Sequence, residues 1–184
     1  MVKLIRMKVL IPESKIQARI KVLAKKVRAD YKDEVPIFIG ILKGSFLFMA
    51  DLVREYAAEC EMDFMAVSSY AGGKTGSGVV RLIKDININI KKRSVLIVED
   101  IIDSGLTSNY IKQYLKLRKP KSIEFITLLD KPESRKNKID IKYIGFSVPN
   151  KFVIGYGLDF AEKYRQLPHI AVFDEDEEEQ ERTE

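Results

Sequence analysis

The sequence predicts an α/β protein with a doubly wound, mostly parallel sheet flanked by helices, and a small hood subdomain made by the chain ends. Three observations predict this fold. Residues 37–42 and 95–98 are apolar throughout, which is typical of strands buried on both faces. Strand-like, turn-like and helix-like segments alternate three times up to residue 130, which favours right-handed crossovers. A length of 184 residues fits a single domain.

An extended arm and a long helix open the chain. The arm covers residues 1–12 and ends at Pro12. Residues 14–31 predict a helix because apolar side chains recur at helical spacing. Ser14 and Gln17 match a capping box, so we expect the helix to begin there.

The next segments predict the first half of the sheet. Residues 35–42 form the first core strand, which leads through a glycine turn into a helix at 46–56. Residues 62–68 alternate loosely between apolar and polar side chains, as a second strand does, and residues 79–83 predict a returning strand. The alternation in residues 85–90 is compatible with a short strand or with a helical turn.

Two further core elements follow the apolar run at 95–98. Residues 110–117 predict a helix that ends before Pro120. Residues 123–129 are apolar except for Glu124 and Thr127 and predict another buried strand.

The pattern changes at residue 141, where we place the start of the C-terminal part of the hood. Residues 143–150 and 151–159 predict short strands with glycine bends, and residues 160–164 predict one helical turn. Residues 170–173 predict a last short strand. Together with arm 1–12 they are expected to form the hood, which leaves residues 13–140 as the core.

The charges are distributed unevenly. The net charge is +5, although residues 174–184 contain eight acids and one arginine. We expect this acidic tail to be solvated and disordered, as runs of like charge are. The basic body suits nucleic acid or a polyanionic small substrate, and the sequence contains no nucleic-acid motif that favours the first.

Composition also bears on the compartment. Cys60 is the only cysteine, so no internal disulfide can form, and no apolar leader precedes the first helix. The apolar runs are too short to span a membrane. We therefore expect a cytoplasmic protein.

Residues 95–107 combine acids with a glycine turn. Glu99, Asp100 and Asp103 follow the apolar run, at the sheet edge where ligands bind in open α/β folds. Residues 104–107 (Ser-Gly-Leu-Thr) then turn the chain, and the helix that follows offers unpaired N–H groups to an anion. One loop therefore carries carboxylates at its start and a phosphate site at its end.

Other loops also carry polar groups to this edge. The turn at Lys43 and Gly44 is a second strand–glycine–helix anion site. Pro132 keeps Lys131 out of helical geometry at the end of the strand 123–129.

Four glycines lie between residues 72 and 78 and favour a mobile lid, beginning at Ser69 and Tyr70, although a simple hairpin loop explains them as well. A nucleotide P-loop is excluded because Ser68 stands where its first glycine is required.

These motifs resemble the signature of type I phosphoribosyltransferases, and in particular their hypoxanthine-guanine subgroup. The likeness spans most of residues 35–173. The motifs that carry it are Leu42-Lys43-Gly44, Ser69-Tyr70, residues 95–107, Leu129-Asp130-Lys131-Pro132, and residues 151–159 with Arg165. Gly157, where many members have alanine, and the acidic tail depart from the pattern.

The resemblance implies a reaction in which N9 of hypoxanthine or guanine attacks C1 of phosphoribosyl pyrophosphate (PRPP). The products would be IMP or GMP and pyrophosphate. It implies Asp103 as general acid/base, Ser69 and Tyr70 in the lid, and a non-proline cis peptide in the Leu-Lys-Gly turn. Its PRPP-binding residues are Lys43, Gly44, Glu99, Asp100, Ser104, Gly105, Leu106, Thr107 and Arg165. Its purine-binding residues are Lys131, Phe152, Val153 and Asp159, and its Mg²⁺ ligands are Glu99, Asp100 and Asp159.

Two alternatives stay open. Regulators of the same fold sense PRPP or nucleotides and bind nucleic acid, which would suit the basic body. A xanthine-preferring or pyrimidine-using enzyme of this fold is the other. The resemblance also implies a homodimer or homotetramer, and the relative rates on hypoxanthine, guanine and xanthine stay open.

Overall fold

The computed structural model of the protein describes residues 7–70 and 79–173. The expected acidic tail and residues 71–78 of the expected lid lie outside this range.

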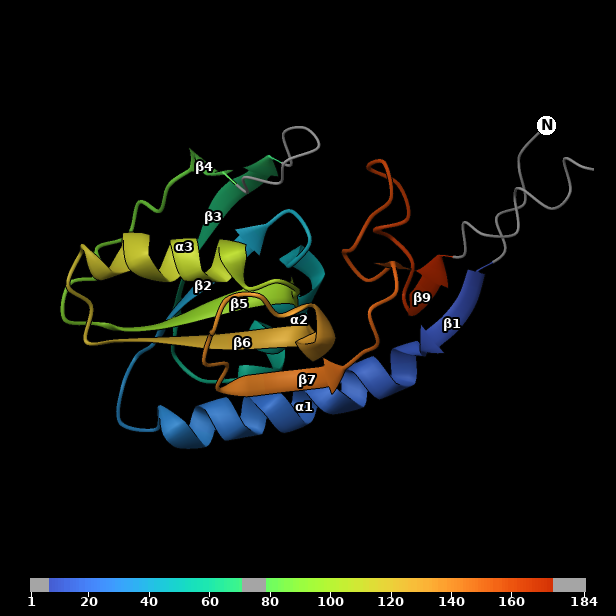
Figure 1. The fold of residues 1–184 in the computed structure, drawn as a ribbon. Coiled ribbons are helices and arrows are strands. Elements are labelled where there is room, and N and C mark those ends of the chain that lie inside the picture. Colours follow the sequence, from blue (N-terminus) through green and yellow to red (C-terminus); the bar gives the residue numbers. More distant parts are fainter. Residues whose placement is uncertain (1–6, 71–78, 174–184) are drawn as a thin grey trace, which may run out of the picture.

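The main sheet has six strands in the order β4-β3-β2-β5-β6-β7 (Figure 1). All of its neighbours are parallel except β4, which returns antiparallel beside β3. The strands are β2 (Ile37–Leu42), β3 (Glu61–Tyr70), β4 (Val79–Lys84), β5 (Ser94–Ile102), β6 (Ser122–Asp130) and β7 (Tyr143–Ser147). The predicted fold class, a mostly parallel α/β sheet, is confirmed.

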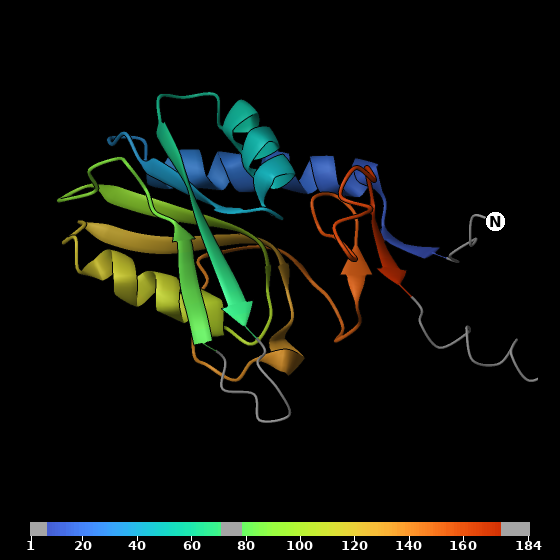
Figure 2. The same ribbon diagram turned by 90° about the horizontal axis from the view of Figure 1, so that it is seen from above.

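Helices cover both faces of this sheet. Helices α1 (Glu13–Asp30) and α2 (Phe46–Tyr56) lie on one face and α3 (Leu106–Lys116) on the other (Figures 1 and 2). Successive side chains of each strand point to opposite faces of the sheet, so each strand contributes to the apolar clusters on both faces. Phe38 belongs to the apolar cluster with α1 and α2, whereas Ile37 and Ile39, on the other face of the strand, belong to the cluster with α3.

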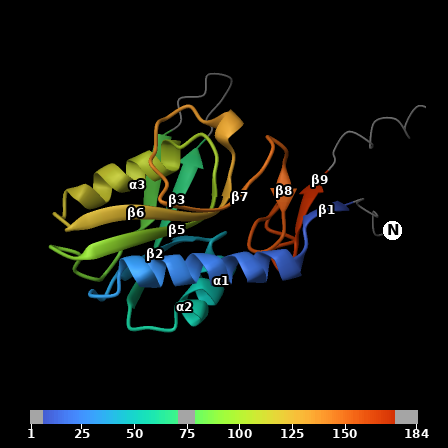
Figure 3. The same cartoon turned by 90° about the horizontal axis from the view of Figure 1, so that it is seen from below.

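A second, antiparallel sheet has the order β1-β9-β8, from β1 (Met7–Ile11), β8 (Val153–Ile154) and β9 (Ile170–Phe173). The arm and the C-terminal segment therefore meet in one hood. The parallel strands of the main sheet point towards it (Figure 3).

The predicted hood boundary at residue 141 is wrong for β7. This strand pairs in parallel with β6 and closes one side of the main sheet. Gly145 permits the approach, because a Cβ there would lie 2.3 Å from the carbonyl oxygen of Leu128. Arg19 of α1 donates to the carbonyls of Ile144 and Gly145 at 2.7 Å, so the helix also fixes β7 from the outside.

The predicted capping box is also wrong. Helix α1 begins at Glu13, directly after Pro12, and no side chain caps it. The Gln17 amide instead donates to Asp51 of α2 at 2.8 Å. The Gln17 side chain, which the local pattern assigned to the helix cap, therefore makes a contact with another helix instead.

The predicted helical turn at residues 160–164 is a hairpin. Phe160 and Lys163 exchange two backbone hydrogen bonds, at 3.1 and 3.0 Å. Ala161 and Glu162 between them both have positive φ, 49° and 64°. Left-handed backbone at two successive residues is typical of a tight hairpin turn and incompatible with a right-handed helix.

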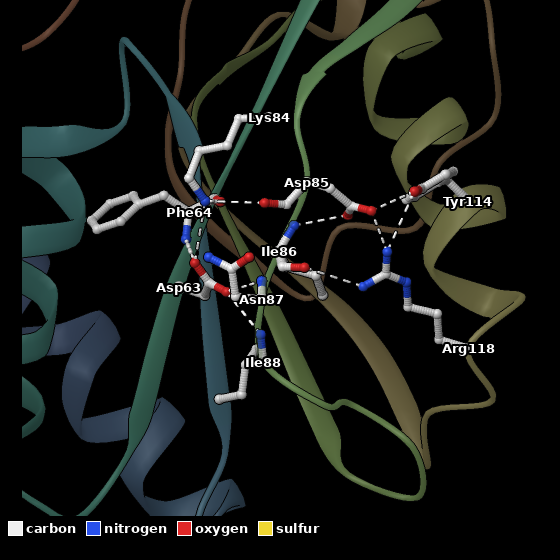
Figure 4. A network of polar contacts seen from close by, with 9 residues as sticks. All are labelled: Asp63, Phe64, Lys84, Asp85, Ile86, Asn87, Ile88, Tyr114 and Arg118. Atoms are coloured by element: carbon white, nitrogen blue, oxygen red, sulfur yellow. Dashed lines mark hydrogen bonds and ion pairs between the residues drawn. The ribbon is translucent and has the colours of Figure 1, made fainter.

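Residues 85–90 form neither a strand nor a helical turn, the two possibilities left open by the sequence. A network of polar contacts holds this linker instead (Figure 4). Asp63 accepts hydrogen bonds from the backbone N–H groups of Asn87 and Ile88, at 2.6 and 3.1 Å. Burial raises the pKa of Asp63, but backbone donors outweigh it and the pKa lies below its usual value. Asp85 accepts from Tyr114 at 2.6 Å and pairs with Arg118, which ties this linker to α3.

Within residues 7–70 and 79–173, none of the helices combines the length and the hydropathy needed to cross a bilayer.

Candidate functional site

The candidate site lies where β2 and β5 end. These two strands are neighbours, and the chain leaves them in opposite directions across the sheet. Such a switch point is where open α/β sheets bind ligands. The loops after β2, β5 and β6 carry most of the predicted site residues to this edge, and the hood lies beyond it (Figure 3).

The loop after β2 brings backbone close to the acids of β5. The peptide bond Leu42–Lys43 is cis, as the resemblance implied. A Cβ on Gly44 would lie 1.6 Å from a carboxylate oxygen of Asp100, so only glycine fits here. Lys43 is exposed, and its ammonium contacts Glu162 of the hood at 2.9 Å.

The adjacent acids Glu99 and Asp100 face opposite sides of β5, as strand alternation requires. Glu99 is 4% exposed and accepts a hydrogen bond from Ser108 of α3 at 3.1 Å. Asp100 is half-buried beside Gly44. The structure therefore brings Asp100 to the β2 loop, whereas the Glu99 carboxyl is directed to the first turns of α3.

Burial controls the charge of both acids. Burial, together with the nearby charge of Asp100, raises the pKa of Glu99 to about 8 against the opposing hydrogen bond from Ser108. Burial raises the pKa of Asp100 to about 6, although backbone hydrogen bonds and the Arg165 guanidinium oppose it. At neutral pH Glu99 is therefore mostly protonated and Asp100 mostly ionised, and a bound cation would favour the carboxylate form of both.

These pKa values predict how ligand-free stability depends on pH. Folding raises both pKa values, so the two acids contribute full stability below their unfolded values of about 4. That contribution is lost as the pH rises through about 6 for Asp100 and about 8 for Glu99. Thermal unfolding without ligand should therefore show a midpoint that falls between pH 5 and pH 9.

Glu99→Gln should flatten the upper part of this pH dependence, and Asp33→Asn, which changes an exposed acid, should leave it intact. An unfolding midpoint that rises with pH in the unmodified protein would contradict the burial argument.

The Ser-Gly-Leu-Thr turn after β5 leads directly into a helix, as predicted. Gly105 has φ +79° and precedes α3, whose first residues are Leu106 and Thr107. A Cβ on Gly105 would lie 2.7 Å from the carbonyl oxygen of Asn137, so the glycine is required by the segment packed behind the turn. The Ser104 hydroxyl accepts a weak hydrogen bond from Leu106 N–H at 3.4 Å.

Asp103 is exposed and has no hydrogen bond to another described side chain. The backbone on both sides of it is held, however. The carbonyl of Ser104 accepts from the N–H groups of Lys136 and Asn137, at 3.0 and 2.9 Å. The carbonyl of Ile102 accepts from Lys131 N–H at 3.0 Å.

Lys131 is 7% exposed at the end of β6. It forms no ion pair with the adjacent Asp130, whose carboxylate pairs with Arg135. Within the described part of the chain its ammonium has no carboxylate partner. The ammonium is thus available to donate a hydrogen bond to a carbonyl of a bound ligand.

The hood supplies aromatic and charged groups to the same edge. Phe152 is 50% exposed and contacts Phe160 and Phe173 edge to face, with ring centroids 5.8 and 6.0 Å apart. Val153, the next residue, is buried in β8. An exposed aromatic ring held by two others is a suitable stacking surface for a flat base.

Arg165 joins several parts of the hood. It pairs with Asp159 at 2.8 Å and donates to the Gly157 carbonyl at 2.8 Å. Gly157 has φ +99°, and a Cβ there would lie 2.0 Å from the carbonyl oxygen of Gly44. The hood therefore contacts the β2 loop backbone to backbone, at the position where the family pattern usually has alanine.

Three contributors were absent from the sequence prediction. Glu162 pairs with both Lys43 and Arg165, the two cations predicted to bind pyrophosphate. Ser108 binds Glu99, and Arg135 binds Asp130. Of these, Ser108 could have been predicted, since it lies one residue beyond the Ser-Gly-Leu-Thr turn on the buried side of α3.

The predicted metal ligands fit Mg²⁺ only as a partial set. Within the described residues there is no cluster of three or more His, Cys, Asp or Glu side chains. Asp100 and Asp159 interact electrostatically and offer carboxylate oxygens, which this hard cation prefers. Mg²⁺ is often held by one or two carboxylates together with substrate oxygens, so the donor set is suitable for a metal that arrives with a phosphorylated substrate.

Known proteins share this sequence and fold. The phosphoribosyl transferase domain family matches residues 12–161. The hypoxanthine-guanine phosphoribosyltransferase of Bacillus subtilis (strain 168) is 50% identical over 165 residues, covering 90% of this chain and 92% of that protein. The hypoxanthine phosphoribosyltransferase of Escherichia coli (strain K12) is 48% identical over 164 residues, or 88% and 92% of the two chains.

A crystal structure of a hypoxanthine-guanine phosphoribosyltransferase from Bacillus anthracis, with a HEPES molecule in its active site, superimposes with a TM-score of 0.87. It is 46% identical in sequence and covers 91% of this chain and 98% of its own.

Proposed function

The chain belongs to the phosphoribosyltransferase family, and we propose that its site carries out the purine salvage reaction. The protein is an enzyme that transfers the 5-phosphoribosyl group from PRPP to N9 of hypoxanthine or guanine, giving IMP or GMP and pyrophosphate. The observation that carries this proposal is the convergence of acids, a phosphate turn and a nearly buried lysine on one edge of the sheet.

The loops after β2 and β5, together with the hood, bind PRPP. Residues 104–107 receive the 5′-phosphate at the N-terminus of α3, where N–H groups lack partners. Asp100 and Glu99 accept hydrogen bonds from the ribose hydroxyls. Lys43, Gly44 and Arg165 take the pyrophosphate, whose negative charge grows as the C1–O bond breaks. Glu162, which engages both cations in the ligand-free protein, then gives way to the pyrophosphate.

The purine lies between the loop after β5 and the hood. Phe152 stacks on the base, and the backbone of Val153 bonds to its edge beside Asp159. Lys131 donates to the 6-oxo group. As N9 forms its bond to C1 the base must lose a proton, which Asp103 accepts at N7.

Mg²⁺ is the proposed cofactor. Asp100, Glu99 and Asp159 are the residues that would hold it, and the cation would offset the negative charge of PRPP. Cation binding would also lower the raised pKa values of the two acids on β5, because an opposite charge favours the carboxylate.

We further propose a homodimer or homotetramer in the cytoplasm, a lid that includes Ser69 and Tyr70, and no role for nucleic acid or membranes. The regulator alternative is less favoured because a PRPP sensor needs neither Asp103 nor Lys131.

The proposal predicts Mg²⁺-dependent formation of IMP from hypoxanthine and PRPP, followed by absorbance and by chromatography of the product. Chelation with EDTA should abolish turnover, and excess Mg²⁺ should restore it. Guanine should give GMP, and xanthine serves as the competing base. A protein that binds PRPP, turns over no purine and shifts a DNA or RNA fragment at physiological salt would be the regulator instead.

A further inference from the structure

We propose that Arg135, anchored on Asp130, is a positioning residue that holds Asp103 and Lys131 in register on the two sides of the purine. This inference rests on the roles proposed above for Asp103 and Lys131. It assigns a task to the segment of residues 130–137, which the family motifs do not explain beyond Pro132.

The 130–137 segment holds the backbone on both sides of Asp103. Before it, the Ile102 carbonyl accepts from Lys131 N–H at 3.0 Å and from the Arg135 guanidinium at 3.4 Å. After it, the Ser104 carbonyl accepts from two backbone N–H groups of the same segment. Because the Asp103 side chain is exposed, its direction depends on these backbone contacts.

An ion pair anchors the segment. Asp130 is the last residue of β6 and is 7% exposed, and its carboxylate pairs with Arg135, whose side chain is 18% exposed. The Asp130 carbonyl accepts from Val148 N–H at 2.9 Å, which fixes this anchor to the chain after β7. A nearly buried pair is screened little by solvent, and breaking it leaves an uncompensated charge.

Arg135 also reaches the phosphate turn. Its second terminal nitrogen is buried without a hydrogen-bond partner and would lie 3.5 Å from a Cβ on Gly105. One planar guanidinium thus lies between the end of β6, the Ile102 carbonyl and the glycine of the turn. A lysine offers a single point charge and cannot reproduce this fork.

The geometry separates two kinds of effect. Loosening the 130–137 segment displaces Asp103 and Lys131, whereas α3 keeps its own anchors, from Ser108 to Glu99 and from Tyr114 to Asp85. The chemical step should therefore lose more than PRPP affinity does, and the affinity should fall slightly because the segment also packs behind Gly105. Misplacement by about 1 Å costs about 10²-fold in rate.

The test compares Arg135→Gln, Arg135→Lys and Asp130→Asn with a matched control, Arg93→Gln. Arg93 also pairs with an acid, Glu61, and donates to a carbonyl, that of Val35, but at the opposite edge of the sheet. The measurements are the single-turnover rate, the Kd of PRPP, the hypoxanthine-to-adenine ratio of kcat/KM, and the Tm.

We expect each of the three variants to lower the single-turnover rate about 10- to 100-fold and to narrow the base preference, with the Kd of PRPP changed less than about fivefold. The double variant Asp130→Asn/Arg135→Gln should be no slower than either single one, because one pair acts as a unit. Arg93→Gln should lower only the Tm and leave the single-turnover rate, the Kd of PRPP and the base preference unchanged.

A rate that is unchanged well below the Tm, or a full rescue by Arg135→Lys, would overturn the positioning role. So would rate losses that multiply in the double variant. If Arg135→Gln does not fold, Asp130→Asn carries the same test. An unmodified protein without purine turnover would refute the proposed function, whereas an active protein with unaffected variants would refute this inference alone.

Discussion

Asp103→Asn is expected to lower the single-turnover rate about 10²–10⁴-fold while leaving the Kd of PRPP nearly unchanged. An amide cannot accept the purine proton, and general acid/base help is typically worth this factor. The affinity should persist because residues 104–107 and the β2 loop, which are proposed to bind PRPP, are unchanged. Rapid quench of IMP formation with enzyme in excess measures the chemical step, and calorimetry measures PRPP binding.

Glu133→Gln is the control for this experiment, because it removes an exposed carboxylate from the neighbouring segment. An unchanged chemical step in Asp103→Asn would remove Asp103 from the reaction, and a parallel loss of PRPP affinity would point to a structural role.

Lys131→Gln is expected to lower kcat/KM for the 6-oxopurines and to reduce the ratio of kcat/KM for hypoxanthine to that for adenine. An ammonium can only donate, so it matches the carbonyl of hypoxanthine or guanine and opposes the amino group of adenine. Sites built around one polar contact can discriminate by about 10⁴-fold, and a glutamine amide can rotate to donate or to accept. The low exposure of Lys131 and its lack of a carboxylate partner favour this role over an ion pair.

The measurement is kcat/KM for hypoxanthine, guanine and adenine in both proteins. Lys136→Gln, an exposed lysine on the same segment, controls for loss of charge. If the hypoxanthine-to-adenine ratio is the same in Lys131→Gln as in the unmodified protein, the base is selected by another contact.

Local patterns were sufficient to predict the buried parallel strands, because strands such as β5 bury both faces along an unbroken apolar run, residues 95–98. They failed where a distant segment decides the structure. Strand β7 has glycine and aromatic residues that suggested the hood. Its pairing with β6, the approach of Gly145 to Leu128 and the hydrogen bonds from Arg19 of α1 place it in the main sheet. The linker 85–90 depends in the same way on Asp63 and Tyr114.

Many residues of the candidate site could be predicted because they lie close together in short motifs. Residues 99–107 carry acids and a glycine turn within one short segment, so the roles proposed for them can be argued from the sequence alone. The opposite faces of Glu99 and Asp100 follow from strand alternation and could have been predicted. Arg135 and Glu162 could not, because each acts on partners that only the folded chain brings together.

The hood joins the first and last strands that the structure describes, since β1 pairs with β9. A ribosome releases the N-terminal end of a chain first, so the strands of the main sheet emerge well before β9 does. Until then Ile16 of α1 lacks Val153 and Ile170, with which it shares one core. An emerging chain would carry the phosphate turn but neither Phe152 nor the Asp159–Arg165 pair. Catalytic competence therefore comes last in synthesis, and chains that stop early expose apolar surface of the kind that chaperones recognise.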